Sequence, residues 1–301
     1  MPLSPSAESN HDGVLLLAHG TVENLDDLPA FLARIRHGRP AAPELVAEVR
    51  RRYALIGHSP LLDQTREQAS KLASRLQLPV FIGMRLWHPS IESALEEAIN
   101  AGCQRVCLLP LAPFSVHVYV RAVEDCARTL AAQGMVPPAL VSGAAWGTHP
   151  SFVDAHAELI ARDVSPEAAL VLTAHSLPSR AIESGDPYAL LVSQAAQAIG
   201  RRSGREYRLA YQSQGADGGA WLGPDLHSVL QQLAKEGVRR AVLSPIGFLT
   251  EHVETLYDLD VEAAAWARDL DIELSRIPAI GPHPGLIEAL ADVARTALSP
   301  T

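Results

Sequence analysis

The sequence predicts an α/β fold of two similar Rossmann-like domains, each a mostly parallel sheet flanked by helices, with a cleft between them. Two observations carry this prediction. Short apolar runs alternate with segments of helical period along the whole chain, and strands that alternate with helices are joined by right-handed crossovers into a parallel sheet. In addition, two blocks of the first half recur, in the same order, in the second half.

Eight short apolar runs have the length and composition of buried strands. They cover residues 13–20, 79–84, 105–113, 139–146, 169–176, 207–213, 240–248 and 272–280. Between and after them, apolar residues recur at helical spacing. These predicted helices cover residues 62–77, 90–101, 117–134, 150–162, 187–201, 224–236, 251–269 and 284–298.

Two pairs of blocks form the internal repeat. A buried run that ends in Ala-His and a small residue occurs as "LLLAHGT" (15–21) and as "LVLTAHSLP" (170–178). A helix that ends at glycine and leads into an apolar run occurs as "EEAINAGCQRVCLLPLAPF" (96–114) and as "LQQLAKEGVRRAVLSPIGF" (230–248). Two matched pairs in the same order indicate a duplication.

The repeat divides the chain near residue 146. Gly102 and Gly237 follow the matched helices at the position where glycine is the usual choice. We expect a first domain over 1–146 and a second over 147–301, with the last predicted helix (284–298) packing back on the first domain. Open parallel sheets bind ligands at the carboxyl ends of their strands, so both Ala-His pairs are expected at the cleft.

The composition is that of an ordinary globular protein and argues against several classes. The net charge of −9 is opposite to the basic surface of a nucleic-acid binder. We find no signal-peptide pattern and no run of roughly 18 apolar residues, so we expect a cytoplasmic protein without an integral membrane segment. Cys103, Cys107 and Cys126 are expected as thiols in a reducing compartment. Three cysteines are too few for the thiolates of an ordinary iron–sulfur cluster.

An acidic ladder stands in the predicted helix 251–269. Glu254, Asp258 and Glu262 are four residues apart, so they share one face of an α-helix. Like charges at this spacing destabilise an isolated helix by roughly 0.2–0.5 kcal/mol per pair. The ladder is either a solvated acidic face or a path for cations, and the second interpretation needs a partner from elsewhere in the chain.

His175 is the candidate partner. It ends the first predicted strand of the second half, and "EHVE" (251–254) follows the third, so both open onto the same cleft. A lone histidine at a strand end is more often a structural polar residue than a ligand. The surrounding motifs, "TAHSLP" and "GFLTEHVETLYDLDVE", favour a ligand over a structural residue, because they resemble the most diagnostic motifs of the ferrochelatases. These are type II chelatases that insert ferrous iron into a porphyrin.

The resemblance extends over nearly the whole chain. Further matching blocks are an arginine-rich segment (33–69), "GMRLWHPSIESALEEA" (83–98), "SGDPYALLV" (184–192) and "YQSQGADGGAWLGPDL" (211–226). The resemblance implies a chelatase-type fold with the active site between the domains. It also implies ferrochelatase activity in haem biosynthesis, in which ferrous iron enters a porphyrin and two protons leave.

By motif position, the resemblance assigns catalysis to His175 and Glu254. It implies that His175, Glu254, Asp258 and Glu262 handle the metal. An imidazole with a carboxylate suits ferrous iron and leaves coordination positions for the ring. The two pyrrole N–H protons also require a base near the ring. Whether His175 acts first as ligand or as base is open, and the acidic ladder becomes a route for metal in or protons out.

The resemblance also implies the porphyrin contacts. Apolar walls suit the ring, and arginine holds a propionate by two hydrogen bonds. The matching positions are His19, Arg36, Arg52, Tyr53, Ser59, Tyr119 and Trp221. His19 stands where many soluble bacterial relatives carry tyrosine, and it is either a second axial ligand or an echo of the repeated strand end. Trp221 is either a cleft or a core residue, and His37 replaces a family arginine, which weakens one propionate contact.

The expected partners are a porphyrin and ferrous iron, both as substrates, with no permanently bound cofactor, no iron–sulfur cluster and no nucleic acid. The protein is expected to act as a monomer. Protoporphyrin IX and coproporphyrin III both stay open, and the soluble bacterial relatives favour coproporphyrin III. Two alternatives remain: a chelatase for another tetrapyrrole such as sirohydrochlorin, which "AHGT" (18–21) also resembles, and a porphyrin or haem carrier without turnover.

Overall fold

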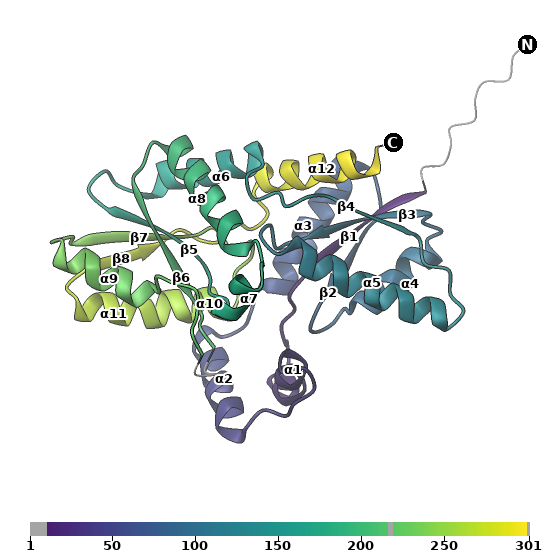
Figure 1. Ribbon diagram of the computed structural model, residues 1–301, viewed down its shortest axis with the longest axis horizontal. Helices are drawn as coiled ribbons and strands as arrows, with labels where there is room; N and C mark the ends of the chain where they lie inside the picture. Colours follow the sequence, from purple (N-terminus) through teal and green to yellow (C-terminus); the bar gives the residue numbers. More distant parts are fainter. Residues whose placement is uncertain (1–10, 216–218, 300–301) are drawn as a thin grey trace, which may run out of the picture.

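The structure, a computed structural model, describes residues 11–215 and 219–299 of the chain. Within these residues it contains two four-stranded parallel sheets with helices packed on them (Figure 1). The first sheet has the order β2-β1-β3-β4, with β1 at Asp12–Ala18, β2 at Val80–Met84, β3 at Arg105–Pro110 and β4 at Ala139–Ser142. The second has the order β6-β5-β7-β8, with β5 at Ala169–His175, β6 at Tyr207–Gln212, β7 at Arg240–Pro245 and β8 at Glu273–Arg276. The predicted α/β fold and all eight predicted strands are confirmed.

The two sheets share one strand order because the same local pattern is repeated. The central strands β1 and β5 are almost entirely buried, as expected for parallel strands covered on both faces. Gly102 and Gly237 have φ angles of +75° and +81°. They directly follow the C-caps of α4 (Ile91–Asn100) and α9 (Leu226–Lys235), where glycine adopts this conformation at least cost. Each glycine lets the chain turn from a helix into the next strand.

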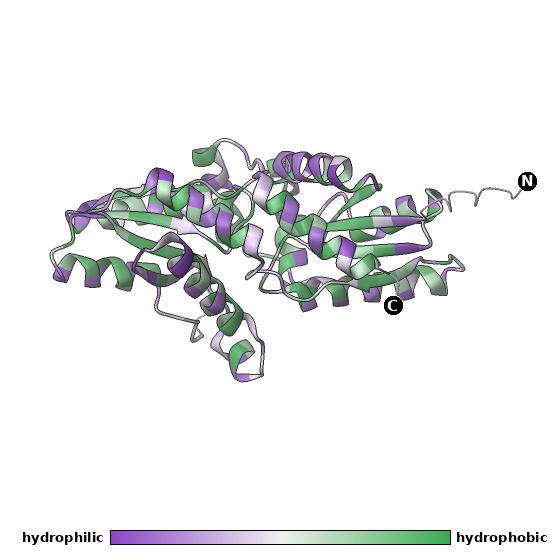
Figure 2. Cartoon of the chain, turned by 90° about the horizontal axis from the view of Figure 1, so that it is seen from above, coloured by the Kyte–Doolittle hydropathy of each residue, from purple (hydrophilic) through white to green (hydrophobic). Residues whose placement is uncertain are grey.

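The helices bury one side and expose the other. Figure 2 shows strands that are largely hydrophobic and helices that carry hydrophobic and hydrophilic residues on different sides. We call the sheet β1–β4 with its helices the first lobe, and the sheet β5–β8 with its helices the second lobe. The remaining covering helices are α3 (Leu61–Leu76), α5 (Val116–Ala132), α8 (Tyr188–Ser203) and α11 (Ala264–Asp269).

The last helix after each sheet crosses to the other lobe. α6 (Pro150–Asp163) follows β4 but packs against α8, and α12 (Pro284–Leu298) follows β8 but packs against α3 and β3. Glu288 of α12 accepts hydrogen bonds of 2.7 and 2.8 Å from Arg75 of α3. Buried apolar residues of both lobes therefore form one continuous cluster. The division at residue 146 stays a prediction.

Two helices that the sequence analysis does not assign lie apart from the sheets, at the bottom of Figure 1. α1 (Leu28–Ile35) lies mostly before the arginine-rich segment and α2 (Pro43–Ile56) lies within it. Each has a proline in its first turn, which is a helix-start signal. The short α7 (Ser179–Glu183) and a 3-10 turn at Leu25–Asp27 are also unassigned. In the described part of the chain, no helix is both long and apolar enough to cross a membrane.

The prediction of one α-helix over 251–269 is wrong. The segment divides into α10 (Val253–Leu256), a π-helical turn (Asp258–Ala263) and α11. The amide of Glu262 donates to the carbonyl of Tyr257, five residues back, at 3.0 Å, which is the π-helical pattern. The apolar spacing of the segment is compatible with either helix, so only the tertiary contacts decide between them.

Candidate active site

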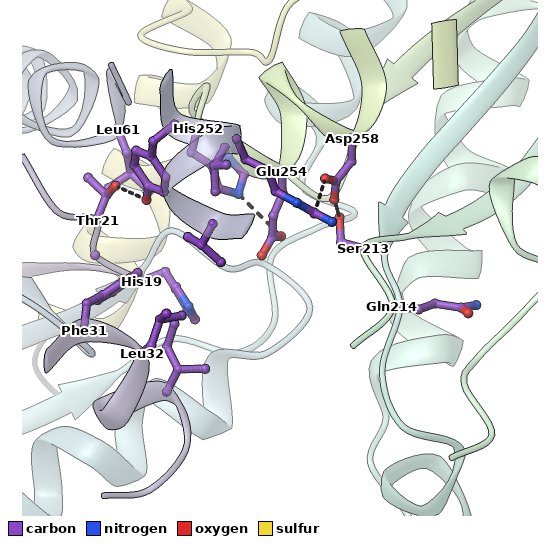
Figure 3. Close-up of a pocket in the computed structure, with 16 residues that line it drawn as sticks. His19, Thr21, Phe31, Leu32, Leu61, Ser213, Gln214, His252, Glu254 and Asp258 are labelled. Carbon is purple, nitrogen blue, oxygen red and sulfur yellow. Dashed lines mark hydrogen bonds and ion pairs between the residues drawn. The ribbon is translucent and has the colours of Figure 1, made fainter. Parts of the chain in front are cut away.

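A cavity of about 200 Å³ lies where the two lobes and the α1–α2 pair meet (Figure 3). The first lobe and the helix pair supply a largely apolar wall, formed by His19, Gly20, Thr21, Phe31, Leu32, Ile35, Val49, Arg52, Tyr53 and Leu61. The second lobe supplies a polar wall, formed by Ser213, Gln214, His252, Val253, Glu254 and Asp258. Ligand sites commonly measure about 300–1,000 Å³, so a large flat ligand would extend from this cavity into its mouth.

His175 and Glu254, the two predicted catalytic residues, contact one another. Glu254 lines the cavity, whereas His175 is not among its lining residues and lies next to Glu254. His175 is the last residue of β5 and Glu254 lies on α10. The His175 Nε2 and Glu254 Oε2 atoms are 3.4 Å apart, and each side chain is about one-third exposed, at 33% and 31%. His252 Nε2 lies 3.6 Å from the same carboxylate oxygen. Glu254 is therefore held between two imidazoles while keeping an open side.

The charges of the pair stabilise one another. Burial disfavours the charged form of His175, but the Glu254 carboxylate and the Ser176 carbonyl outweigh it, so the pKa of His175 is raised. Burial alone would raise the pKa of Glu254, but His175 and His252 hold that pKa well below its usual range. The Nδ1 atom of His175 contacts the Ser176 carbonyl, which can only accept. Nδ1 therefore carries a proton, and Nε2 is the atom that can bind a metal or accept a proton.

His19 lies on the first-lobe side of the cavity (Figure 3). Its side chain is exposed to the open cleft, but the surrounding walls limit its access to bulk water. This desolvation lowers the pKa of His19 to about 4, against the opposing effect of the Glu254 charge. His19 is therefore neutral at pH 7, with a lone pair available to a metal.

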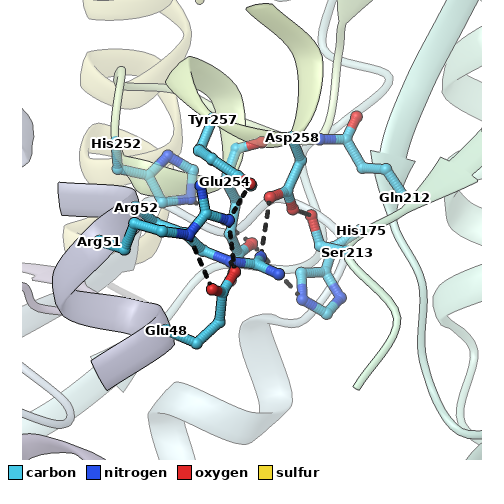
Figure 4. A network of polar contacts seen from close by, with 10 residues as sticks. All are labelled: Glu48, Arg51, Arg52, His175, Gln212, Ser213, His252, Glu254, Tyr257 and Asp258. Carbon is cyan, nitrogen blue, oxygen red and sulfur yellow. Dashed lines mark hydrogen bonds and ion pairs between the residues drawn. The ribbon is translucent and has the colours of Figure 1, made fainter. Parts of the chain in front are cut away.

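A network of charges from α2 and the second lobe surrounds Asp258 (Figure 4). Arg52 of α2 donates to Glu48 at 2.9 Å, approaches Asp258 Oδ1 to 3.4 Å and lies 4.7 Å from the centre of the Tyr257 ring. Ser213 donates a hydrogen bond to Asp258. The repulsion expected within the acidic ladder is thus reduced by an arginine of α2, which the sequence predicted only as a contact to a porphyrin propionate.

We expect Asp258→Asn to change stability in a pH-dependent way. Burial raises the pKa of Asp258 from 3.8 to about 6, despite the hydrogen bond from Ser213. Between these values the folded state binds more protons than the unfolded state, so the free energy of unfolding falls as pH rises. The resulting cost is absent below pH 4 and reaches about 3 kcal/mol above pH 6.

Urea unfolding of the wild type and Asp258→Asn at pH 4 and pH 7 measures this cost. The variant should gain stability relative to the wild type as pH rises. Asp269→Asn, at an exposed position on α11, is the control and should show a constant difference. A constant difference for Asp258→Asn as well would contradict the prediction.

Only some of the other predicted porphyrin contacts line the cavity. Tyr53 lines the cavity and its hydroxyl lies 2.9 Å from Thr21 Oγ1. The buried Tyr119 packs against the Arg85 guanidinium, 5.9 Å from the ring centre, and burial raises the pKa of Tyr119 to about 12. Four predicted porphyrin contacts do not line the cavity itself: Arg36, Ser59, Tyr119 and Trp221.

The four predicted metal-handling residues do not form one ligand cage. Within residues 11–215 and 219–299, no group of three or more His, Cys, Asp or Glu side chains is arranged to hold an ion. His175 and Glu254 are close neighbours, whereas Asp258 is paired with Arg52 and Ser213. Glu262 is half-buried and does not line the cavity.

Sequence reasoning missed four polar residues that line the cavity: Thr21, Ser213, Gln214 and His252. His252 stands two residues before Glu254, inside the motif "EHVE" (251–254), so its place in the sequence was a usable signal. Ser213 and Gln214 directly follow β6. Both stand at the carboxyl end of a strand, which is the position that led to His175.

Solved structures show the class of fold. The chain resembles SirB from Bacillus subtilis with Fe3+, with a TM-score of 0.63 and 16% identity over 95% of this chain and 96% of that one. It also resembles CbiX, the terminal enzyme for biosynthesis of siroheme in denitrifying bacteria. The TM-score is 0.54, with 14% identity over 95% of this chain and 100% of that one. The two-lobed architecture is that of the type II chelatases.

Sequence comparisons show to which family of chelatases the chain belongs. The ferrochelatase family model matches residues 11–298. The coproporphyrin III ferrochelatase of Anoxybacillus flavithermus is 34% identical over 93% of this chain and 94% of its own. The ferrochelatase of Thermus thermophilus is 33% identical over 94% and 98%. The chain belongs to the ferrochelatase family, as its motifs predicted, and it is an enzyme of that family.

Proposed function

We propose that this enzyme inserts ferrous iron into a porphyrin with release of two protons, as a step of haem biosynthesis. The observation that carries the proposal is the His175–Glu254 pair, 3.4 Å apart, beside a cavity with an apolar wall. An apolar wall suits the face of a macrocycle. An imidazole with a carboxylate suits a divalent cation of intermediate softness. Family membership supports the same reaction class.

In the proposed reaction the ring rests against the apolar wall, with its nitrogens toward the pair. Iron(II) forms bonds to the four ring nitrogens while the two pyrrole N–H bonds break. The protons pass to the His175–Glu254 pair and then to solvent, so a dication replaces two protons and no electron is transferred. The Glu254 carboxylate, which raises the pKa of His175, stabilises the imidazolium that forms when His175 takes up a proton.

We infer that the ring is coproporphyrin III rather than protoporphyrin IX. Support comes from relatives named coproporphyrin III ferrochelatase, among them that of Anoxybacillus flavithermus. Insertion of ferrous iron should be measured anaerobically, in parallel, with coproporphyrin III, protoporphyrin IX and sirohydrochlorin. We expect the highest kcat/KM with coproporphyrin III. Turnover of sirohydrochlorin alone would indicate a different chelatase, and tight porphyrin binding without any turnover would indicate a carrier.

We also propose that His19 binds iron from the ring face opposite His175. A neutral imidazole on the first-lobe wall supports this role. His19→Ala should change the visible absorption of the enzyme–product complex, because an axial ligand alters the electronic spectrum of the metalated ring. His88→Ala, at an exposed histidine of the same lobe, is the control. A spectrum identical to that of the wild type would remove His19 from the ligand set.

We further propose that the protein acts in the cytoplasm, as a monomer and without a permanently bound cofactor. The three cysteines are unpaired thiols, which is typical of a reducing compartment. Light scattering of the purified protein and analysis of its bound iron and sulfide measure the last two properties. A stable dimer, or stoichiometric iron with sulfide, would contradict them.

A further inference from the structure

Two glutamines of α3 hold the loop that leads to Glu254. The side chain of Gln68 is fully buried, at 0% exposure. Its amide nitrogen donates to the carbonyls of Leu249 at 3.0 Å and of Gly281 at 2.9 Å. One turn earlier, the side-chain carbonyl of Gln64 accepts a hydrogen bond of 2.9 Å from the amide of Glu251. A first-lobe helix therefore binds the backbone of the loop at residues 249–251 at two points, and that of the segment before α12 at a third, the Gly281 carbonyl.

The chemistry of these contacts fixes the orientation of Gln68. An amide nitrogen has two hydrogens and can donate to two carbonyls at once. The flipped amide would place its oxygen against two other oxygens, so only one orientation is favourable. A carboxylate, a thioether or an aliphatic group at this position cannot make both bonds. The contact is therefore specific to a primary amide.

Hydrogen bonds also hold the residues between this contact and Glu254. The Glu251 carboxylate accepts hydrogen bonds of 2.7 Å from both Arg276 and the amide of Ala279. The amide of His252 donates to Thr255 Oγ1 at 3.0 Å, which closes the start of α10. Gln212 then donates to the backbone carbonyl of Glu254 at 3.0 Å. We therefore expect a shift at residues 249–251 to move the Glu254 carboxylate.

The same helix, α3, also forms part of the cavity wall against which the ring is proposed to bind. Leu61, the first residue of α3, lines the cavity. Leu61, Gln64 and Gln68 are three and seven positions apart, so they lie on one side of the helix. One helix, α3, thus contributes to the wall of the proposed porphyrin site and also contacts the loop that leads to Glu254.

We propose that α3 sets the position of Glu254 relative to the bound ring, with Gln68 as the main positioning residue and Gln64 as its support. The inference rests on the proposed function of the site and adds residues that touch neither ring nor metal. Catalysis is sensitive to placement, and a displacement of 1 Å costs on the order of 10²-fold in rate.

The test is Gln68→Met, which keeps the length of the side chain but removes both hydrogen bonds. We expect kcat for iron insertion to fall by up to about 10²-fold, while KM for the porphyrin and its affinity by fluorescence quenching stay unchanged, because the apolar wall is intact. Gln64→Met should cause a smaller loss of the same kind. As Glu254 moves away from His175, the pKa of His175 should fall, which NMR titration of its imidazole measures whether or not iron is inserted.

Thr65→Val is the matched control. Thr65 lies on the same helix, is also 0% exposed, and its hydroxyl bonds only the Leu61 carbonyl of that helix, at 2.7 Å. It should lower thermal stability without changing kcat or the His175 titration. Wild-type kcat and an unchanged His175 titration in Gln68→Met, or equal losses in Thr65→Val, would overturn the inference. If Gln68→Met does not fold, the half-buried Gln64 supplies the same test. An inactive wild type would refute the proposed function instead.

Discussion

Replacing Glu254 with glutamine is expected to reduce iron insertion by about 10²–10⁴-fold, the range supplied by a positioned proton-transfer group. Glutamine keeps the size of the side chain but removes the charge that lies 3.4 Å from His175 Nε2. It also removes the interaction that raises the pKa of His175. The residual activity should therefore extend to lower pH, because His175 would stay neutral there. Anaerobic insertion rates measured from pH 5 to pH 9 record both effects.

A measurement of porphyrin affinity shows whether Glu254→Gln impairs the chemical step or the binding of the porphyrin. The apolar wall belongs to the first lobe and the helix pair, so ring affinity should be retained in Glu254→Gln. The control is Glu273→Gln, which removes an exposed carboxylate of β8 that pairs with Arg240 at 2.9 Å. This variant should insert iron at the wild-type rate. Full activity in Glu254→Gln would end the catalytic assignment.

The second large effect concerns stability. Arg276 is 10% exposed and lies 2.7 Å from Glu251, whose side chain is 11% exposed. Burial favours a raised pKa for Glu251, but the Arg276 charge outweighs it, and the pKa of Glu251 is lowered. Arg276→Met would leave this carboxylate charged and buried without its cation. Loss of one partner of a buried pair costs about 3–5 kcal/mol, which equilibrium unfolding in urea should detect.

A second variant distinguishes the buried pair from its exposed neighbour. Arg276 also donates to Asp260 at 2.6 and 2.7 Å, but that carboxylate is 39% exposed. Asp260→Asn should therefore cost no more than about 1 kcal/mol. Similar losses in the two variants would show that the buried contact with Glu251 is not the source of the stability.

Much of the fold follows from local patterns in the sequence. Apolar runs of strand length, separated by segments of helical period, located all eight strands. The glycines at 102 and 237 marked the repeat because a positive φ angle is costly for other residues. α1 and α2 were missed although each has a proline in its first turn, Pro29 and Pro43, which is a helix-start signal.

The two central residues of the site were also predictable, for a topological reason. In parallel sheets the carboxyl ends of the strands meet at one edge, so His175 at the end of β5 and Glu254 after β7 were expected to face one cleft. The distance of 3.4 Å between their side chains agrees with that expectation. His252 was equally accessible to this reasoning, since it belongs to the same motif.

What the sequence by itself determined is therefore the alternating α/β architecture, its internal repeat, and the strand ends at which the site is built. Only the tertiary structure decided that the segment after β7 contains a π-helical turn, that Arg52 lies beside Asp258, and that Gln68 bonds the loop before Glu254. The physical reason is separation along the chain. Arg52 and Asp258 are 206 residues apart, and Gln68 and Leu249 are 181 apart, and no local periodicity encodes which distant side chains will share a buried environment.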